Sequence, residues 1–584
     1  MLNKHAGPSR IPRQSSTPPY RGVICLVTLL IAVTSSWAQT TELAPPEPTP
    51  QASSDRIIAV NGEIGILGEL YSISGRENRR PDNLARLSLR STITAWNSLS
   101  ASFNLMLSSE GSSARQDINQ IDFNPRWRWG EAHLGDFAYE FTPLTLSGIR
   151  IRGGGVMITP GKWRFSFLTG LTRRSVSTYD NNRSYERLVS GGRIGFGQSE
   201  GSYFDLYAFT ARDRLESLAE LPVDTTTSTD TADVVFDQDP ITVTPQENVV
   251  ISTVTNLALF SRKLKWRTEI SGSAITRDRR SSELDVSDVP EFVTNLFKPR
   301  VSSSADYSWH TEIDVDLSRV SVSMGYEYIG PGYVSLGLAS QSNDRREFTG
   351  GVMWRHKAGV VRLDGAIQSD NLIHQKLFTT DRVRLTGTTS YQASRQWRTN
   401  LLITYTGAAN DAASSAMATD FSSWVFRTGQ SVTFARQMGL KSLTFDYTLQ
   451  TAGDDNPARS GTEVKSHSAT FGGTITLREN LEFVPSIGLV SSRVGSSDRA
   501  LTQTYSASAR LTALRRRLTT NTSLVVAIGE ETTSIRPAVK SSYLIAPQLT
   551  ANFELESTLG RSESETPGGD FDEFTARVSI TRRF

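Results

Sequence analysis

One serine lies in the spacing that many hydrolases use for their nucleophile, in the run Gly197-Gln-Ser199-Glu-Gly201. Such a serine reacts only where a turn between a strand and a helix raises its hydroxyl above a sheet. Here we expect strands on both sides, over residues 192–196 and 203–209. The context therefore predicts a hairpin turn at Ser199 and argues against a catalytic serine.

Residues that commonly bind metals are sparse in this chain. It has 6 histidines and 1 cysteine, Cys25, and no two histidines lie at the short spacing of a metal site. Zinc and related metals need several such ligands converging on one point. The sequence therefore predicts no metal site, no cofactor and no enzymatic activity.

Charged residues at every second position are the remaining candidates for chemistry. Side chains two residues apart in a strand point to the same face, so each such row would form one charged wall. The acidic row around His310 could bind cations or a basic segment, or it could solvate a water-filled pore, which is the usual role of lumen residues. Opposed acidic and basic walls would create a transverse field. We predict a lumen lined by Arg86, Arg90, Arg150, Arg152, Asp306, His310, Glu312, Asp314, Asp316, Arg382 and Arg384.

Strands must position these rows, and the clearest pair of strands carries the acidic one. Residues 305–317 place side chains suited to lipid at odd positions and mostly charged or polar ones at even positions. After Ser318-Arg319, residues 320–328 alternate in the same way, which predicts a hairpin. Similar pairs recur from residue 57 to the end, with tight turns and long polar segments in alternation.

The last strand carries the most specific pattern of the chain. Its apolar face consists of Phe574, Ala576, Val578, Ile580 and Phe584. A final strand with an apolar outer face, a polar inner face and a C-terminal Phe resembles the closing strand of Gram-negative outer-membrane β-barrels, such as porins. The resemblance implies that Phe584 is a membrane-insertion signal read by the barrel-assembly machinery. Arg582 departs from the pattern because it takes a lipid-side position, although an Arg near a strand end can reach the headgroup layer.

Barrels of this class place short turns on the periplasmic side and long loops outside. If the C-terminus is periplasmic, counting strands back from it places the short turns on the periplasmic side. Counting forward from the N-terminus gives the same placement only if an extra strand forms between residues 110 and 146. We predict that residues 117–123 descend, that Asn124-Pro125-Arg126 turns, and that residues 127–134 rise. The fold class is then all-β, a single large antiparallel transmembrane β-barrel of about 26 strands (24–26) with short periplasmic turns and long extracellular loops.

The sequence predicts a barrel at residues 57–584 and two segments before it. Residues 1–38 combine basic residues, an apolar run too short to span a bilayer as a helix, and small residues before a cleavage point after Ala38, which is typical of a signal peptide. Residues 39–56 form a Pro-rich periplasmic leader that cannot pack a core, but that offers an extended segment to a periplasmic partner. We therefore expect export to the outer-membrane lipid bilayer.

The overall composition fits this reading. The chain has 62 basic and 60 acidic residues and no charge block, which argues against nucleic acid as a partner. Its mean hydropathy of −0.30 would normally argue for a soluble protein, but a barrel escapes this inference because only alternate strand residues face lipid. Composition therefore does not decide between the two classes, and the periodicity of the strands does.

We predict a porin-like channel for the passive passage of polar solutes. The alternatives are an export conduit for a polymer or protein substrate and a surface scaffold or adhesin. A bore this wide needs a constriction, and the acidic loop at residues 213–247 is the expected one. Its carboxylates would favour cations. They include Asp224, Asp230, Asp233, Asp237, Asp239 and Glu247.

Overall fold

The computed structural model of this protein describes residues 58–96, 98–110, 119–176, 183–218, 243–285, 297–435, 438–562 and 569–584. The chain divides into Met1–Ile57 and Ile58–Phe584, and only the second unit falls within the described residues. The predicted signal peptide and Pro-rich leader lie outside them.

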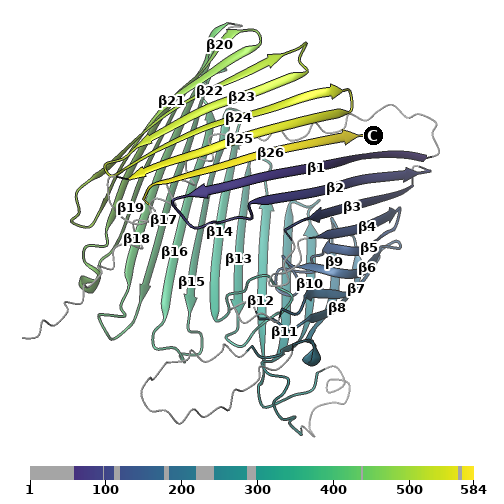
Figure 1. The fold of residues 1–584 in the computed structure, drawn as a ribbon. Helices are drawn as coiled ribbons and strands as arrows, with labels where there is room; N and C mark the ends of the chain where they lie inside the picture. Colours follow the sequence, from purple (N-terminus) through teal and green to yellow (C-terminus); the bar gives the residue numbers. More distant parts are fainter. Residues whose placement is uncertain are drawn as a thin grey trace, which may run out of the picture. The chain divides into compact units, whose positions relative to one another are not determined.

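The described chain is built almost wholly of β-strands (Figure 1). In the first half they are β1 (Ile58–Ser74), β2 (Asn83–Ala95), β3 (Leu99–Ser108), β4 (Gln120–Trp127), β5 (Gly130–Ala138), β6 (Arg150–Ile158), β7 (Trp163–Arg173), β8 (Arg187–Gly197), β9 (Tyr203–Asp213), β10 (Glu247–Leu259), β11 (Leu264–Thr276), β12 (Ser303–Asp316) and β13 (Val320–Ile329). In the second half they are β14 (Arg345–His356), β15 (Gly359–Asp370), β16 (Thr380–Gln392), β17 (Trp397–Asn410), β18 (Asp420–Thr433), β19 (Gly439–Asp454), β20 (Val464–Arg478), β21 (Leu481–Val494), β22 (Ala500–Ala513), β23 (Leu518–Ile528), β24 (Thr532–Ala546), β25 (Leu549–Ser562) and β26 (Phe571–Arg583).

Short 3-10 helices, η1 (Leu215–Ser217) and η2 (Pro457–Arg459), interrupt two of the connections. Within the described ranges, no helix is long and apolar enough to cross a bilayer.

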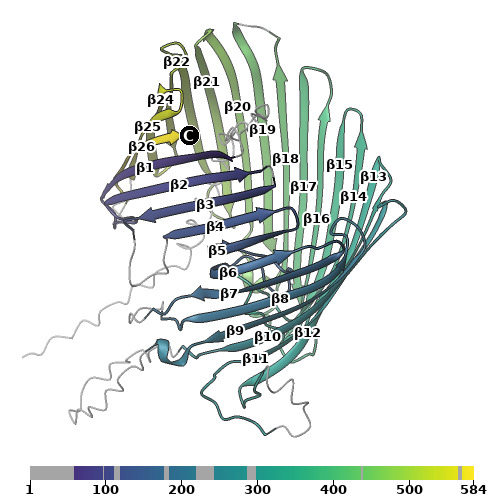
Figure 2. The ribbon, with the colours of Figure 1, turned by 90° about the vertical axis from the view of Figure 1, so that its right-hand side faces the viewer.

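Each strand pairs antiparallel with its neighbours in sequence, and β1 pairs with β26 to close a 26-stranded sheet (Figures 1 and 2). The C-terminal residue takes part in this closure: the Phe584 N–H donates to the Gly62 carbonyl at 3.0 Å, and the Gly62 N–H donates to the Phe584 carbonyl at 2.9 Å. The prediction of a single closed antiparallel barrel of about 26 strands is therefore confirmed.

Short turns join strands at the end of the barrel where β1 begins and β26 ends. Longer connections join them at the other end, except for the three residues between β23 and β24. The predicted hairpin of β12 and β13 is confirmed, and Ser318 adopts a φ of 70° in its turn. Ser199 lies in the hairpin turn between β8 and β9, as expected, where the Gln198 N–H donates to the Ser202 carbonyl.

The predicted turn at Asn124-Pro125-Arg126 is wrong. These residues lie inside β4, and the chain reverses after Trp127 instead. Proline is compatible with this strand because it lacks an N–H, and the ladder between β4 and β5 has no registered pairs at Asn124 or Pro125. The extra strand predicted between residues 110 and 146 is nevertheless present, as β4.

The two faces of the closed sheet differ in their side chains. One face carries exposed large apolar residues along nearly every strand, for example Ile66, which is 62% exposed, and Met324, which is 64% exposed. In a barrel this is the lipid-facing side, which we call the outer face. The exposed tryptophans Trp397 and Trp424 belong to this face, and tryptophans are enriched at the interfaces of a membrane. The apolar cluster of fully buried residues lies on the opposite, inner face.

Candidate functional site

Most of the charged rows predicted to line the lumen lie on the inner face. On β12, Tyr307 and Trp309 are exposed on the outer face, so the even-numbered residues point inward. On β2 and β16, the odd-numbered residues Ile93 and Leu385 are exposed on the outer face. The even-numbered residues of these two strands therefore also point inward. The predicted residues placed on the inner face in this way are Arg86, Arg90, Asp306, His310, Glu312, Asp314, Asp316, Arg382 and Arg384.

Arg150 and Arg152 are not on this face. Ile151 lies between them on β6, has 0% exposure and packs in the apolar cluster of the inner face. The two arginines therefore project outward, where Arg152 Nε lies 2.8 Å from the Asp136 carboxylate. Asp136 in turn accepts the backbone N–H of Ile121 at 3.0 Å, so this ion pair ties β4, β5 and β6 together.

The acidic and basic rows are joined rather than opposed. The His310 ring on β12 lies 3.6 Å from Glu327 on β13, which also pairs with Arg345 on β14. Beside Arg345, Glu347 lies 3.9 Å from Arg384 on β16. The predicted field between facing walls is thus replaced, over these strands, by a local network of alternating charges. Glu327, Arg345 and Glu347 were missed in the sequence. Glu327 lies between Tyr326 and Tyr328, which places it on the inner face, and the exposed Phe348 places the odd-numbered residues of β14 there too.

Two long connections fold against the inner face, and we call them the first inward loop (residues 139–149) and the second inward loop (residues 330–344). They come from hairpins far apart in the sheet, yet Ser147 and Leu338 form a parallel bridge. The Tyr333 hydroxyl donates to the Leu144 carbonyl at 2.8 Å, and the Ser335 hydroxyl donates to the Thr145 carbonyl. The two loops therefore form one packed body.

This body is fixed to the wall by polar contacts from inner-face side chains. The Asn248 amide donates to the Val334 carbonyl at 2.9 Å and accepts the Leu336 N–H at 3.0 Å. Asp306, which the sequence analysis assigned only to the lumen wall, accepts the Gly332 N–H at 2.8 Å. Asp306 thus holds the start of the second inward loop in place.

Apolar contacts complete the attachment of the loops. Tyr333 and Phe209 are both 0% exposed, and they belong to a single cluster that joins the loops to β5–β10 and β13. Burial raises the pKa of Tyr333 to about 12, so its hydroxyl stays a donor at neutral pH. The members of the cluster are Phe137, Phe141, Leu144, Leu146, Ile151, Leu168, Val189, Tyr207, Phe209, Ala211, Val250, Val254, Ile329 and Tyr333.

Buried polar groups lie on the wall around this cluster. Glu269 is 1% exposed and accepts hydrogen bonds from Ser252 and Ser271 at 3.0 and 3.2 Å. Nearer the short-turn end, Arg164 on β7 pairs with Asp205 on β9 at 2.6 Å, with both side chains nearly fully buried. A buried charge needs such partners, because an unpaired one would cost several kcal/mol, on the order of 3–5.

Residues 219–242 of the predicted constriction loop, residues 213–247, lie outside the described residues. Five of its predicted acidic residues, Asp224 to Asp239, fall in that segment. At its ends, Asp213 pairs with Arg187 at 2.7 Å, and Glu247 pairs with Arg212 and Arg279. The described ends of the loop are thus neutralised by arginines.

No cluster of metal-binding side chains occurs among the described residues, and what they do form is a partly filled polar channel. Its inner face carries ion pairs and hydroxyls, which can exchange hydrogen bonds with water and polar solutes. The inward loops occupy the space in front of β5–β13. The arrangement suits passage of solutes along the remaining wall.

No family model matches this chain, and no curated protein matches it. Among solved structures it is similar to the siderophore receptor PirA from Pseudomonas aeruginosa, at 11% identity and a TM-score of 0.40, over 90% of this chain and 80% of that one. It is also similar to a chain of the E. coli P pilus tip assembly intermediate PapC-PapD-PapK-PapG, at 9% identity and a TM-score of 0.42. This match covers 91% of this chain and 62% of that one. A third structure is OccK2 (OpdF) from Pseudomonas aeruginosa, at 11% identity and a TM-score of 0.27, over 90% and 98%. The closed barrel of this chain is shown by its own strand pairing and does not depend on its similarity to these structures.

Proposed function

We propose that this protein is an outer-membrane channel for the passive passage of polar solutes. The observation that supports the proposal is the contrast between the two faces of one closed sheet: exposed apolar side chains outside, and charged or hydroxyl side chains inside. About 26 strands spaced about 4.8 Å apart and tilted about 40° give a backbone diameter of roughly 50 Å. Such a bore has room for a solute path beside the inward loops.

The constriction is formed by the two inward loops in this proposal. They are packed together and hydrogen-bonded to the wall, so they narrow the lumen permanently from the side of β5–β13. The path then runs along β14–β26, whose inner face carries ion pairs open to water. One such row joins Lys540 to Glu554 at 2.5 Å and continues across the closing seam, where Arg577 pairs with Glu69 of β1 at 2.6 Å.

Single-channel conductance in planar bilayers tests the proposal. Replacing residues 333–341 with a short Gly-Ser linker should raise the conductance, because it removes the anchored part of the second inward loop. A matched deletion of residues 222–245 tests the constriction predicted from the sequence. A larger rise after that deletion would assign the constriction to the acidic loop. If the intact protein and both variants fail to conduct, the channel proposal is lost, and an export conduit or a surface scaffold becomes the better explanation.

Delivery to the outer membrane is part of the proposal. We expect residues 1–38 to direct export and Phe584 to be needed for assembly. Deleting Phe584 removes both backbone hydrogen bonds to Gly62 at the closing seam. The truncated protein should therefore lose surface exposure and heat-modifiable migration on detergent gels. Normal surface labelling of the truncated protein would contradict this expectation.

A further inference from the structure

Two cations face each other on the outer face of the barrel. Lys465 on β20 and Arg493 on β21 are direct partners in the antiparallel register. They share the outer face with Phe471 and Ile487, which lie an even number of residues away. Like charges directly opposite in a sheet destabilise it. Both side chains are exposed, and among the described residues no carboxylate forms an ion pair with either.

The pair lies near the long-loop end of both strands and beside a cavity. This cavity has a volume of about 310 Å³, and its lining includes Thr451, Glu463, Lys465 and Arg493. Two cations and one carboxylate therefore line it, which leaves an excess of one positive charge. A hollow with this charge is complementary to an anionic group.

The cations lie at the level of the outer membrane interface. Trp424 on β18 is 52% exposed on the outer face and is registered with Thr451 on β19. Thr451 is in turn registered with Lys465, so one inter-strand row joins the tryptophan to the cation pair. Exposed tryptophans mark the boundary between hydrocarbon and headgroups. At a tilt of about 40°, each step between strands changes the depth by about 3 Å, so Lys465 and Arg493 lie within about 10 Å of the level of Trp424, close to the lipid phosphates.

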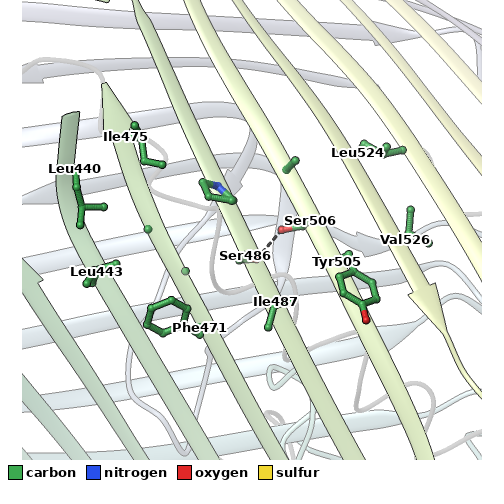
Figure 3. A pocket seen from close by; sticks show the side chains of 14 residues that line it. Leu440, Leu443, Phe471, Ile475, Ser486, Ile487, Tyr505, Ser506, Leu524 and Val526 are labelled. Atoms are coloured by element: carbon green, nitrogen blue, oxygen red, sulfur yellow. Dashed lines mark hydrogen bonds between the residues drawn. The ribbon is translucent and has the colours of Figure 1, made fainter. Parts of the chain in front are cut away.

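A second, apolar cavity lies on the same outer face, farther from the long connections than the first one. Figure 3 shows side chains that line it, among them Leu440, Phe471 and Leu524. Its volume is about 550 Å³. The floor is a row of small or flat residues, Gly473, Pro485 and Ala507, and the larger side chains of Phe471 and Tyr505 stand beside it. The result is a groove across β20–β22.

The groove lies within reach of a lipid whose head group occupies the upper cavity. Gly473 and Pro485 each lie eight residues from the cation on the same strand, which is about 27 Å along the strand and about 20 Å in depth at a tilt of about 40°. One leaflet with its headgroups is roughly 20–22 Å thick. The groove therefore lies at the depth that the acyl chains of an outer-leaflet lipid reach.

We propose that the outer face of β19–β23 binds a membrane lipid with an anionic phosphate head group. The phosphate bridges Lys465 and Arg493 and removes their mutual repulsion, while an acyl chain fills the groove over Gly473, Pro485 and Ala507. Both cavities open toward the bilayer, so a lipid can fill them together. A soluble phosphate would occupy only the upper one.

Native mass spectrometry of the folded full-length protein tests the proposal, with phosphatidic acid and phosphatidylcholine of identical acyl chains as probes. Wild-type protein should retain phosphatidic acid preferentially. The double variant Lys465→Gln/Arg493→Gln should bind it about thirty-fold more weakly, because each basic residue near an anionic lipid contributes roughly a five-fold gain. Arg346→Gln is the control: Arg346 is an exposed outer-face cation on β14 whose strand partners are Tyr328 and Ser369, and this variant should retain the lipid.

The groove is tested separately by Ala507→Leu. This variant should abolish the preference for long acyl chains over eight-carbon chains without affecting binding of the head group. Equal retention of phosphatidic acid by the double variant and the wild type would overturn the proposal, as would equal retention of both lipids by the wild type. Inorganic phosphate that displaces the lipid would also overturn it. A dimer that Ala507→Leu dissociates would instead assign the groove to a second copy of the chain.

Discussion

The wall from β5 to β13, which we call the covered wall, differs from the wall from β14 to β26, the open wall, in what its inner face touches. On the covered wall, inner residues such as Leu168, Phe209 and Val250 are buried under the inward loops. On the open wall, inner residues such as Arg384 and Lys540 are 64% and 54% exposed and pair with carboxylates. One closed sheet thus supports a packed core on one side and a water-facing surface on the other.

The lengths of strands and connections follow the same division. β5 and β6 have 9 residues each, and the connection between them is the first inward loop. β19 and β20 have 16 and 15 residues, and the connection between them, residues 455–463, contains η2 and is two residues shorter than the first inward loop. The open wall thus has longer strands, whereas the covered wall has shorter strands here and a connection that fills part of the lumen. The difference indicates that stability should depend on the covered wall and selectivity on the open wall.

The largest effect should come from Tyr333→Ala in the second inward loop. This change removes a fully buried ring and the hydrogen bond to the Leu144 carbonyl, so we expect a loss of about 3–5 kcal/mol in the free energy of unfolding. Urea unfolding in lipid vesicles measures it. The control Tyr333→Phe removes only the hydroxyl and should cost about 1 kcal/mol. Equal, small losses in both variants would mean that the loop is not part of the folding core.

A second large effect is expected from Gly195→Ala on β8. A Cβ at this position would lie 1.7 Å from the Asp205 carboxylate, so the buried pair with Arg164 must shift. Breaking such a pair costs about 3 kcal/mol or more. The matched control is Gly272→Ala on β11, where nothing lies within 4 Å of the added methyl group. The same unfolding assay should find that variant within about 0.5 kcal/mol of the wild type.

A moderate, pH-dependent effect is expected at Asp344, at the end of the second inward loop. Burial would raise the pKa of this carboxyl, but hydrogen bonds from Lys376 and from the Leu372 N–H outweigh burial and hold the pKa below its ordinary value. Stability from this group is therefore present above the unfolded pKa of about 3.9 and is lost as pH falls through the folded pKa.

Asp344→Asn should then be less stable than the wild type at neutral pH and should approach it in acid. Unfolding midpoints measured between about pH 3 and pH 7 test this, because the window contains the unfolded pKa of an aspartate. Parallel curves for the two proteins would contradict the expectation.

The smallest effect on stability is expected on the open wall, from Arg384→Gln. Arg384 is 64% exposed and lies 3.9 Å from Glu347, so its loss should change the free energy of unfolding by less than about 1 kcal/mol. Reversal potentials in a salt gradient should nevertheless shift toward cations, because a positive charge leaves the path. Arg346→Gln, on the outer face, should leave the reversal potential unchanged. If Arg384→Gln and Arg346→Gln have the same reversal potential, Arg384 does not lie on the route of the ions.

Local alternation in the sequence was enough to predict the strands and the way the barrel closes. The hairpin of β12 and β13 follows from residues that alternate on both sides of Ser318-Arg319, because each strand must face lipid with one side only. The inner placement of the acidic row on β12 follows from the same pattern. The turn at Asn124-Pro125-Arg126 was wrong because a proline can remain in a strand where one ladder lacks bonds, and this depends on the neighbouring strand.

Tertiary structure alone decided which wall is covered. Alternation predicts two faces, but it does not tell which face is inside when both carry apolar residues. Arg150 and Arg152 were therefore predicted to line the lumen, whereas in the structure Ile151 faces inward and the two arginines face outward. The inward loops could not be predicted either, because the contact of Tyr333 with Leu144 joins residues 189 positions apart. Local periodicity fixes each strand, whereas such distant contacts form only after the sheet has closed.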